Sequence, residues 1–549
     1  MSTLTPSAVA PSVPVAARRW GGFTATGALL RFALRRDRVR IPVWTVAVAL
    51  MFPYAALAIE TVYPTAADRQ ARALLLSTPA GVLMSGPGYG LDDYTLGALM
   101  ANEMLLYGIV AVAVMSIQLV VRHTRTEEAT GRAELVRASV VGRHAVLTSA
   151  LLDVLVANAA VVVVTGAGMA AIGLAALDSF AMAIAMGLSG LVFGAVAAVT
   201  AQVTEYPRGA TGAALGLLGV AFVLRGIGDV QQLHGSWVSW LSPIAWAQQT
   251  RAYVDLRWWP LALSVVAIVV GVALAAALSV RRDVGAGLVP PRAGRADARP
   301  ALAGPFALAW RQQRTSVLVW GAGLFLFAVA FGTLISSVED MLAENPVMEE
   351  LIGSGTDLQE GFAAVMLLFF ALGVAAFGLA ALLRMRTEEE SGRAAPVLAT
   401  RVTRSRWLAG GLIVAAVGTL ALLALTALGT ALGALAVGTD TSLVVAILLG
   451  ALVYLPPLAV CLGLGLALYG WAPRFAGLAW VVVAWSFVVG MFGSMLGLSD
   501  AVRSLSPFEH VPLMPGGVVE AGPLLALTGV AAALVVAGFA GFRRRDVTG

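Results

Sequence analysis

Long runs of apolar residues dominate the chain, and short polar segments separate them. A helix needs about 20 apolar residues to cross the ~30 Å hydrocarbon layer of a bilayer. The pattern therefore predicts an all-α polytopic membrane protein. We expect twelve membrane-spanning helices at 41–63, 99–121, 145–171, 176–202, 210–228, 260–280, 316–337, 362–383, 407–437, 441–470, 475–497 and 522–542.

Polar motifs repeat at matching places in two halves of the chain. RTEEATGRAELVRASVVGR (125–143) and RTEEESGRAAPVLATRVTR (386–404) are identical at eleven of nineteen positions, and each follows a second apolar run. RRDV follows the sixth and the twelfth runs, at 281–284 and 544–547. Six helices per copy is an even number, so both copies have the same orientation in the membrane. Further matches pair WLSP (240–243) with SLSP (504–507), YPRGA (206–210) with APRFA (472–476), and Arg35, Arg38 and Trp44 with Arg311, Arg314 and Trp320.

The duplication divides the chain into four segments. Residues 1–23 are rich in Ala, Pro and Ser, and we expect a disordered cytoplasmic tail there. Residues 24–284 form the first six-helix half, and residues 302–549 form the second. Between them, residues 285–301 have the Pro, Gly and Arg content of a flexible cytoplasmic linker.

All 36 lysine-plus-arginine residues are arginines, and their distribution indicates the orientation. Cytoplasmic loops of membrane proteins carry an excess of basic residues. An N-terminus in the cytoplasm places all but six arginines on that side. We therefore expect both termini on the cytoplasmic side of a bacterial plasma membrane. The six exceptions are Arg69, Arg72, Arg225, Arg251, Arg257 and Arg503.

The composition excludes several kinds of site. Apolar residues make up 59% of the chain and charged residues 12%, against roughly 25% charged in a soluble domain. The single cysteine, Cys461, excludes an internal disulfide and a cysteine-based metal site. The phosphate-binding loop G-x-x-x-x-G-K-[ST] needs a lysine. Any ATP hydrolysis therefore belongs to another chain.

The RTEE-x-x-GR motifs and LSPIAWAQQ (241–249) resemble those of the membrane subunit of type-2 ATP-binding-cassette exporters. The chain is most similar to the fused two-half group found with polyketide (tetronasin-type) antibiotic resistance in actinobacteria, along essentially its whole length. The resemblance implies efflux of hydrophobic or amphipathic drugs or polyketide-like antibiotics. It also implies interfacial elbow helices at about 24–38 and 302–314, a coupling helix in each repeated loop, and outer re-entrant hairpins that contain WLSPIAWAQQTRAY and LSPFEHVPLMPGG.

The same resemblance implies the partners. Two copies of a separate ATPase subunit would carry ATP and Mg, while this chain has no catalytic residues, no cofactor and no metal of its own. The other expected partners are the lipid bilayer and hydrophobic small-molecule substrates, and no nucleic acid.

Each repeated loop is expected to form a docking surface for an ATPase subunit. A glycine in the left-handed conformation would end the preceding helix, and a short helix would follow over 132–139 and 393–400. The acidic pairs and the arginines offer charged hydrogen bonds to a partner. An alternative is that these charges only keep the loop in the cytoplasm. The candidate coupling residues are Glu127, Glu128, Gly131, Arg132, Glu388, Glu389, Gly392 and Arg393.

The copies of the loop are not equal, since Glu134, Leu135 and Arg137 are replaced by Ala395, Pro396 and Leu398.

In the family that the chain resembles, the substrate path runs between the halves and is lined by the first, second and fifth helix of each. Aromatic residues on these helices suit bulky apolar ligands. Lipid contact or helix packing is the alternative for each of them. The candidates are Phe52, Phe222, Phe325, Phe369, Trp485 and Phe487.

Ionisable residues inside the apolar runs are functional suspects. Asp153 has Val414 at the equivalent place in the second half. It would serve either in a proton or cation relay or in a packing hydrogen bond, with Asn158 or a nearby Ser or Thr as partner. Arg225 and Asp229, four residues apart on one helix, are expected to pair with each other.

Two other classes of protein remain open. A proton-coupled secondary transporter of the major facilitator type also has twelve helices in parallel halves, but its repeated basic motif lies in a tight turn rather than a loop of about twenty residues. A membrane-embedded enzyme would need clustered polar side chains. We expect all four histidines (His123, His144, His234 and His510) in loops without metal-ligand spacing.

Overall fold

The computed structural model describes residues 21–76, 79–283, 285–290, 304–337, 358–492 and 499–546. Within these residues every regular element is a helix, and twelve helical segments are long and apolar enough to span a membrane. The prediction of an all-α polytopic membrane protein is confirmed. The chain divides into two compact units, Met1–Ala293 and Gly294–Gly549, here called the first half and the second half.

The first half begins with the short helix α1 (Thr26–Arg36) and then contains six spans. Its second span, Leu96–Ala129, is one continuous helix that includes two π-helical turns, η1 (Met100–Met104) and η2 (Arg122–Thr126). The other elements are α2 (Arg40–Val62), α3 (Ala66–Leu76), α4 (Pro79–Ser85), α5 (Leu96–Leu99), α6 (Leu105–Val121), α7 (Glu127–Ala129), α8 (Arg132–Arg137), α9 (Ala145–Ala171), α10 (Ala176–Val203), α11 (Pro207–Gln231), η3 (Ser239–Leu241), α12 (Pro243–Gln248) and α13 (Pro260–Ser279).

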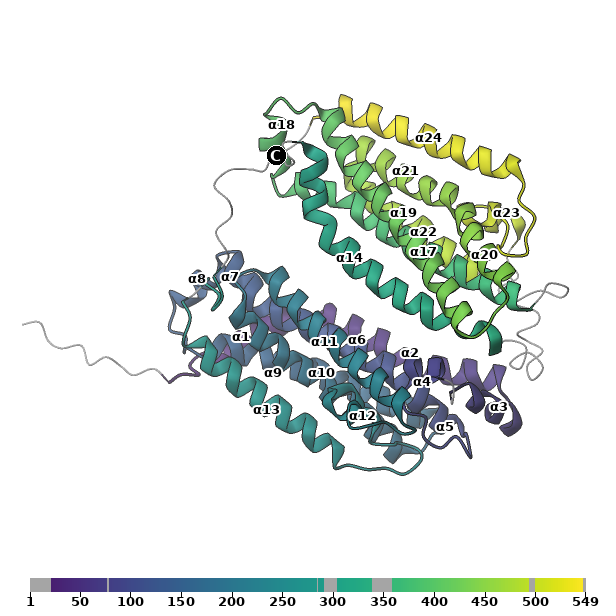
Figure 1. Ribbon diagram of the computed structural model, residues 1–549. Coiled ribbons are helices and arrows are strands. Elements are labelled where there is room, and N and C mark those ends of the chain that lie inside the picture. The colour runs from purple at the N-terminus through teal and green to yellow at the C-terminus, as the bar shows by residue number, and fades with distance from the viewer. Residues whose placement is uncertain are drawn as a thin grey trace, which may run out of the picture. The chain divides into compact units, whose positions relative to one another are not determined.

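Helix α10 lies at the centre of the first half, in contact with α6, α9, α11 and α13 (Figure 1). Small residues allow these helices to approach closely. Close packing matters here because lipid chains are as apolar as the side chains, so the hydrophobic effect does not drive helices together within a membrane. At Gly190, for example, a Cβ atom would lie 2.1 Å from Asn158 Oδ1. The sequence of α10 is therefore fixed by packing along much of its length.

The second half follows the same order of spans. Its elements are α14 (Pro305–Gly332), η5 (Ile335–Ser337), α17 (Leu358–Glu390), α18 (Ala394–Leu398), α19 (Arg404–Ala436), α20 (Thr441–Gly450), η6 (Ala451–Tyr454), α21 (Leu455–Trp471), η7 (Pro473–Leu478), α22 (Ala479–Phe492), α23 (Asp500–Arg503), η8 (Pro507–His510) and α24 (Ala521–Arg544).

Glycines bring two helix pairs of the second half together. A Cβ at Gly433 in α19 would lie 2.2 Å from the carbonyl oxygen of Val329 in α14. A Cβ at Gly470 in α21 would lie 2.2 Å from the carbonyl oxygen of Gly538 in α24. Larger residues at these positions would force the backbones apart, so the second half is also held by close contact between backbones.

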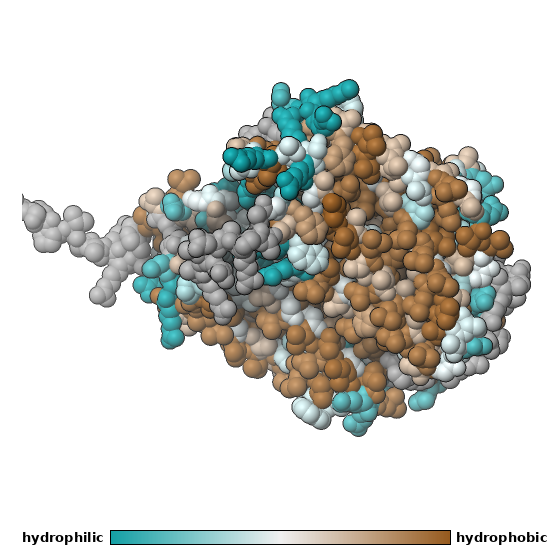
Figure 2. All heavy atoms as spheres, turned by 45° about the horizontal axis from the view of Figure 1, so that its top comes forward, coloured by the Kyte–Doolittle hydropathy of each residue, from teal (hydrophilic) through white to brown (hydrophobic). Residues whose placement is uncertain are grey.

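The sixth helix of each half presents exposed apolar side chains. Val265, Val266, Val269 and Val270 on α13 and Leu525 on α24 are all exposed. Figure 2 shows that apolar side chains cover much of the visible surface and that hydrophilic ones gather towards its edges. Such a surface fits contact with lipid chains, since a soluble protein exposes few large apolar patches.

Some helix boundaries differ from the sequence-based ones for local reasons. The predicted second elbow at 302–314 is not a separate helix in its described part, because α14 continues unbroken from Pro305 to Gly332. In the first half Asp37 ends α1, and α2 starts at Arg40.

The tenth predicted helix also differs, because it contains a 3-10 turn just before Pro456, which lacks an N–H group. Helices α3 and α4 were not predicted, since they lie in a segment too short to span a membrane. The end of the predicted helix 475–497 lies outside the described residues.

Candidate functional site

The repeated loops have the same backbone turn in both halves. Gly131 and Gly392 each have a φ of 72°, in the left-handed region that favours glycine. The short helices α8 and α18 follow them, as the sequence predicts. No atom lies within 4 Å of a Cβ built at either glycine, so conformation rather than space selects glycine here.

The second glutamate of each pair points inward and binds the arginine of the RRDV motif. Glu128 pairs with Arg282 at 2.7 Å, and Glu389 pairs with Arg545 at 2.6 Å. The side chains of Glu128 and Glu389 are 8% and 7% exposed. The two motifs that occur twice in the sequence therefore bind each other, once in each half.

Each of these ion pairs has further partners. Glu128 also accepts from Arg125 at 2.9 Å, and Glu389 accepts from the Tyr469 hydroxyl at 2.6 Å. Burial lowers the pKa of Arg545, but the hydrogen bonds and charge of Glu389 outweigh this effect and raise the pKa above its ordinary value. The guanidinium thus stays charged.

The first glutamate of each pair has different partners in the two halves. Glu127 pairs with Arg36 at the end of α1, and Arg132 lies 4.0 Å away. Glu388 instead binds Arg393, the first residue after the glycine, at 2.8 and 3.0 Å. The first loop is therefore attached to α1 through Glu127, whereas Glu388 binds an arginine of its own loop.

The exposed face of the loops also differs between the two copies. Leu135 is 77% exposed and Glu134 is also exposed. The matching residues, Ala395 and Pro396, are exposed in the second half. The ion pair between the second glutamate and the RRDV arginine is thus the same in both halves, while the outward surface of the short helix differs. Arg132 and Arg393, at 60% and 51% side-chain exposure, are common to both surfaces.

The aromatic candidates separate into different environments. Phe369 lies 6.4 Å from Phe487, measured between ring centroids, and Phe331 and Phe370 join the same cluster in the second half. Phe331 lies on α14 and was not among the candidates predicted from the sequence. Its place in the cluster depends on how α14 packs against the other helices. Phe487 is 40% exposed, so this cluster reaches the surface of its half.

The remaining aromatic candidates do not join that cluster. Phe52 is fully buried, and its ring and Met186 both pack against Gly108, so it serves the core of the first half rather than an accessible surface. Phe222 lies under the guanidinium of Arg225, 5.1 Å from it. Phe325 packs beside Gly429, and the Trp485 indole donates to the Val502 carbonyl at 3.3 Å.

The predicted pair of Arg225 with Asp229 is present, at 3.4 Å, and both side chains are buried. Asp229 also accepts from the Ser239 hydroxyl at 2.6 Å, and Arg225 donates to the Val82 carbonyl at 3.2 Å. This pair therefore ties α11 to α4 and η3, which supports a structural role.

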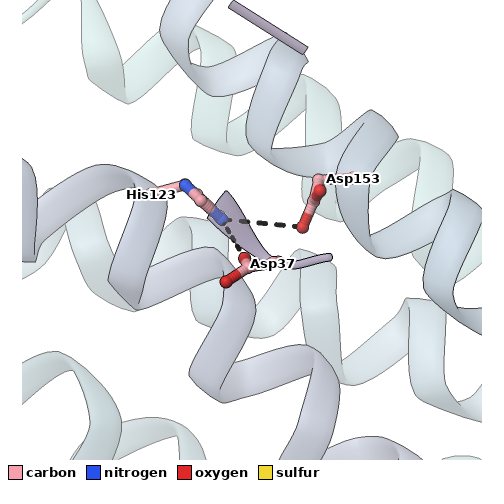
Figure 3. A group of neighbouring side chains, drawn as sticks. All are labelled: Asp37, His123 and Asp153. Atoms are coloured by element: carbon pink, nitrogen blue, oxygen red, sulfur yellow. Dashed lines mark hydrogen bonds and ion pairs between the residues drawn. The ribbon is translucent and has the colours of Figure 1, made fainter. Parts of the chain in front are cut away.

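The predicted partner of Asp153 is wrong. Asn158 donates to Ser116 and to the Val154 carbonyl, and Asp153 instead faces His123 at 3.6 Å (Figure 3). The expectation that all four histidines lie in loops is also wrong, because His123 is buried in the π-helical turn η2. The predicted second span ended at residue 121, whereas the observed helix continues to Ala129. A longer predicted span would have placed His123 on this helix.

Asp37 completes a cluster with these two residues. It accepts a hydrogen bond from His123 and lies 3.1 Å from Arg122 Nε. Burial raises the pKa of Asp37, but the hydrogen bond and charge of His123 and the charges of Arg122 and Arg40 bring it below its ordinary value. Asp37 is therefore ionised at neutral pH.

Comparison with known proteins identifies the class. The model of the family "Multidrug efflux system permease Rv1217c, C-terminal domain" matches residues 27–281 and 302–543. The multidrug efflux system permease protein Rv1217c of Mycobacterium tuberculosis (strain ATCC 25618 / H37Rv) is 38% identical over 558 aligned positions, which cover 100% of both chains. The chain belongs to this family of multidrug efflux permeases. It is a multi-pass membrane protein and a transport subunit.

Proposed function

We propose that the chain is the transmembrane subunit of an ATP-driven exporter of hydrophobic or amphipathic compounds, including polyketide-like antibiotics, and that it works with two copies of a separate ATPase subunit. Both termini would lie in the cytoplasm. The observation that carries the proposal is the repeated loop, which has the same turn and the same internal ion pair in each half.

Two equivalent loops fit two ATPase subunits. A loop that served only to retain arginines in the cytoplasm would need neither a left-handed glycine nor a buried ion pair at a matching place. The absence of lysine from the sequence supports a separate ATPase, because the phosphate-binding loop needs that residue. The expected ATPase contact lies on the outward residues Arg132, Leu135, Arg393 and Pro396, rather than on the buried glutamates.

The aromatic cluster around Phe369 and Phe487 is our candidate for part of the substrate surface. Aromatic rings bury large apolar areas and suit ligands without charges. Phe222, Phe325 and Trp485 stay weaker candidates, because each already has a partner within its own half.

Native mass spectrometry of the complex purified with its ATPase tests the assembly. We expect one copy of this chain with two ATPase subunits, because the duplication already supplies two docking loops. The control is the same preparation with an ATPase that cannot bind ATP. Two copies of this chain per pair of ATPases would contradict the proposal, and so would stable transport by this chain alone.

A further inference from the structure

Asp37, His123 and Asp153 come from three separate elements and meet in the interior of the first half. Asp37 caps the end of α1, His123 lies in η2, and Asp153 lies on α9 (Figure 3). One ligand atom from each residue lies within 4.8 Å of the other two. Asp37 and Asp153 have no exposed surface, and His123 is 8% exposed.

Asp153 lacks the hydrogen bonds that a buried carboxylate requires. Both of its oxygens are buried and accept no hydrogen bond. Its nearest basic atom is His123 Nε2, which is already bonded to Asp37. A buried charge without a partner is strongly unfavourable, so this carboxylate must be neutralised by a proton or by a bound cation, and its side towards His123 is where a cation can bind.

The cluster is not part of the duplicated framework. The second half has Gln313, Arg384 and Val414 at the three aligned positions. Its second span, α17, continues as an α-helix where the first half has the π-turn that carries His123. Gln313 and Arg384 instead line a cavity of about 240 Å³. Packing that is common to both halves therefore does not explain the three residues.

We propose that Asp37, His123 and Asp153 bind one divalent transition-metal ion of the zinc type. One imidazole and two carboxylates are a ligand set that such ions accept, with a water molecule in the fourth position. Bonds of about 2.0–2.2 Å in a tetrahedron place ligand atoms roughly 3.4 Å apart. The separation of 3.6 Å between His123 and Asp153 fits this, and Asp37 would move slightly away from His123.

The surroundings support the ligand positions. Arg122 Nε lies 3.1 Å from Oδ1 of Asp37, the oxygen that does not bind His123, and its charge favours the ionised carboxylate that a metal ion needs. The ion would join α1 to α9, about two turns after the start of that helix, and to the second span at His123, four residues before Glu127. It would thus fix the elbow helix against the first coupling loop.

The test measures zinc on the full-length chain purified in detergent, so it does not depend on transport or on the ATPase. The protein is treated with EDTA, dialysed, supplied with ZnCl₂ and desalted, and its zinc is measured by mass spectrometry. A chromophoric chelator gives the affinity by competition. We expect about one zinc per chain. Asp153→Asn and His123→Gln should each weaken binding about ten-fold or more.

His510→Gln is the matched control, because His510 is exposed and lies in the other half. It should keep the zinc. The proposal is overturned if the wild-type chain retains no zinc. It is also overturned if His510→Gln loses as much zinc as Asp153→Asn, or if Asp153→Asn loses none. Should Asp153→Asn fail to give a monodisperse chain, Asp37→Asn takes its place in the same comparison.

Discussion

At the scale of single residues, the acidic pairs combine two different tasks. The second glutamate of each pair is an internal structural residue, whereas the first anchors the loop to a neighbour that differs between the halves. The two glutamates of each pair are adjacent in sequence, but they do not form a single acidic patch on the surface. Their partners separate the two residues, because Glu128 binds arginines within the first half's core while Glu127 binds Arg36, although both look equally available in the sequence.

Replacing Arg282 tests the internal ion pair. Arg282→Gln leaves the buried Glu128 with Arg125 as its remaining cation. Breaking a buried pair by removing one partner costs about 3 kcal/mol. We expect the free energy of unfolding, measured by denaturant titration in detergent, to fall by about that amount. Arg281→Gln is the control, because Arg281 is the exposed neighbour in the same motif. An equal effect of both changes would refute a specific role for the pair.

At the scale of elements, the short helix after the glycine combines a fixed inner side with a variable outer side. Ala133 and Ala394 are buried at equivalent positions of α8 and α18, while the exposed positions change from Glu134 and Leu135 to Ala395 and Pro396. Two identical ATPase subunits would thus meet two different surfaces. We expect the two loops to contribute unequally to coupling.

Leu135→Ala tests that expectation. Burying a leucine in an interface contributes about 1.5–3 kcal/mol, so its loss should weaken ATPase docking roughly ten-fold or more. We expect drug-stimulated ATP hydrolysis in reconstituted vesicles to need a correspondingly higher ATPase concentration, while drug binding to this chain stays unchanged. Leu505→Ala is the control, since Leu505 is 68% exposed but lies in the predicted outer hairpin. Docking that is unaffected by Leu135→Ala would exclude α8 as the main contact.

At the scale of the whole molecule, the chain is two six-helix units with a shared plan and different interiors. The first half contains a buried acidic and histidine cluster, and the second contains an aromatic cluster that reaches the surface of its half. The repeated motifs give the two halves a common framework, and the polar and aromatic residues of their interiors differ. A single chain can in this way combine equivalent docking loops with unequal interiors.

Deletion of the gene tests the substrate class. We expect sensitivity to several unrelated hydrophobic or amphipathic compounds to increase at least several-fold, because aromatic rings bind such compounds through buried apolar area. Growth-inhibition assays measure it, with the intact gene restored as the control. Increased sensitivity confined to one small hydrophilic solute would point to a different substrate class.

The sequence alone determined the membrane-spanning helices and the duplication, because an apolar run of about 20 residues has few alternatives to a span and because aligned motifs need no coordinates. It also determined the left-handed glycines, since that conformation is a local property of the backbone. Only the tertiary structure decided which side of each helix faces inward. It buried Glu389 and Phe52, and it brought Asp37 and Asp153 to His123 across long stretches of chain. Such choices depend on how whole helices pack, and no local pattern records that.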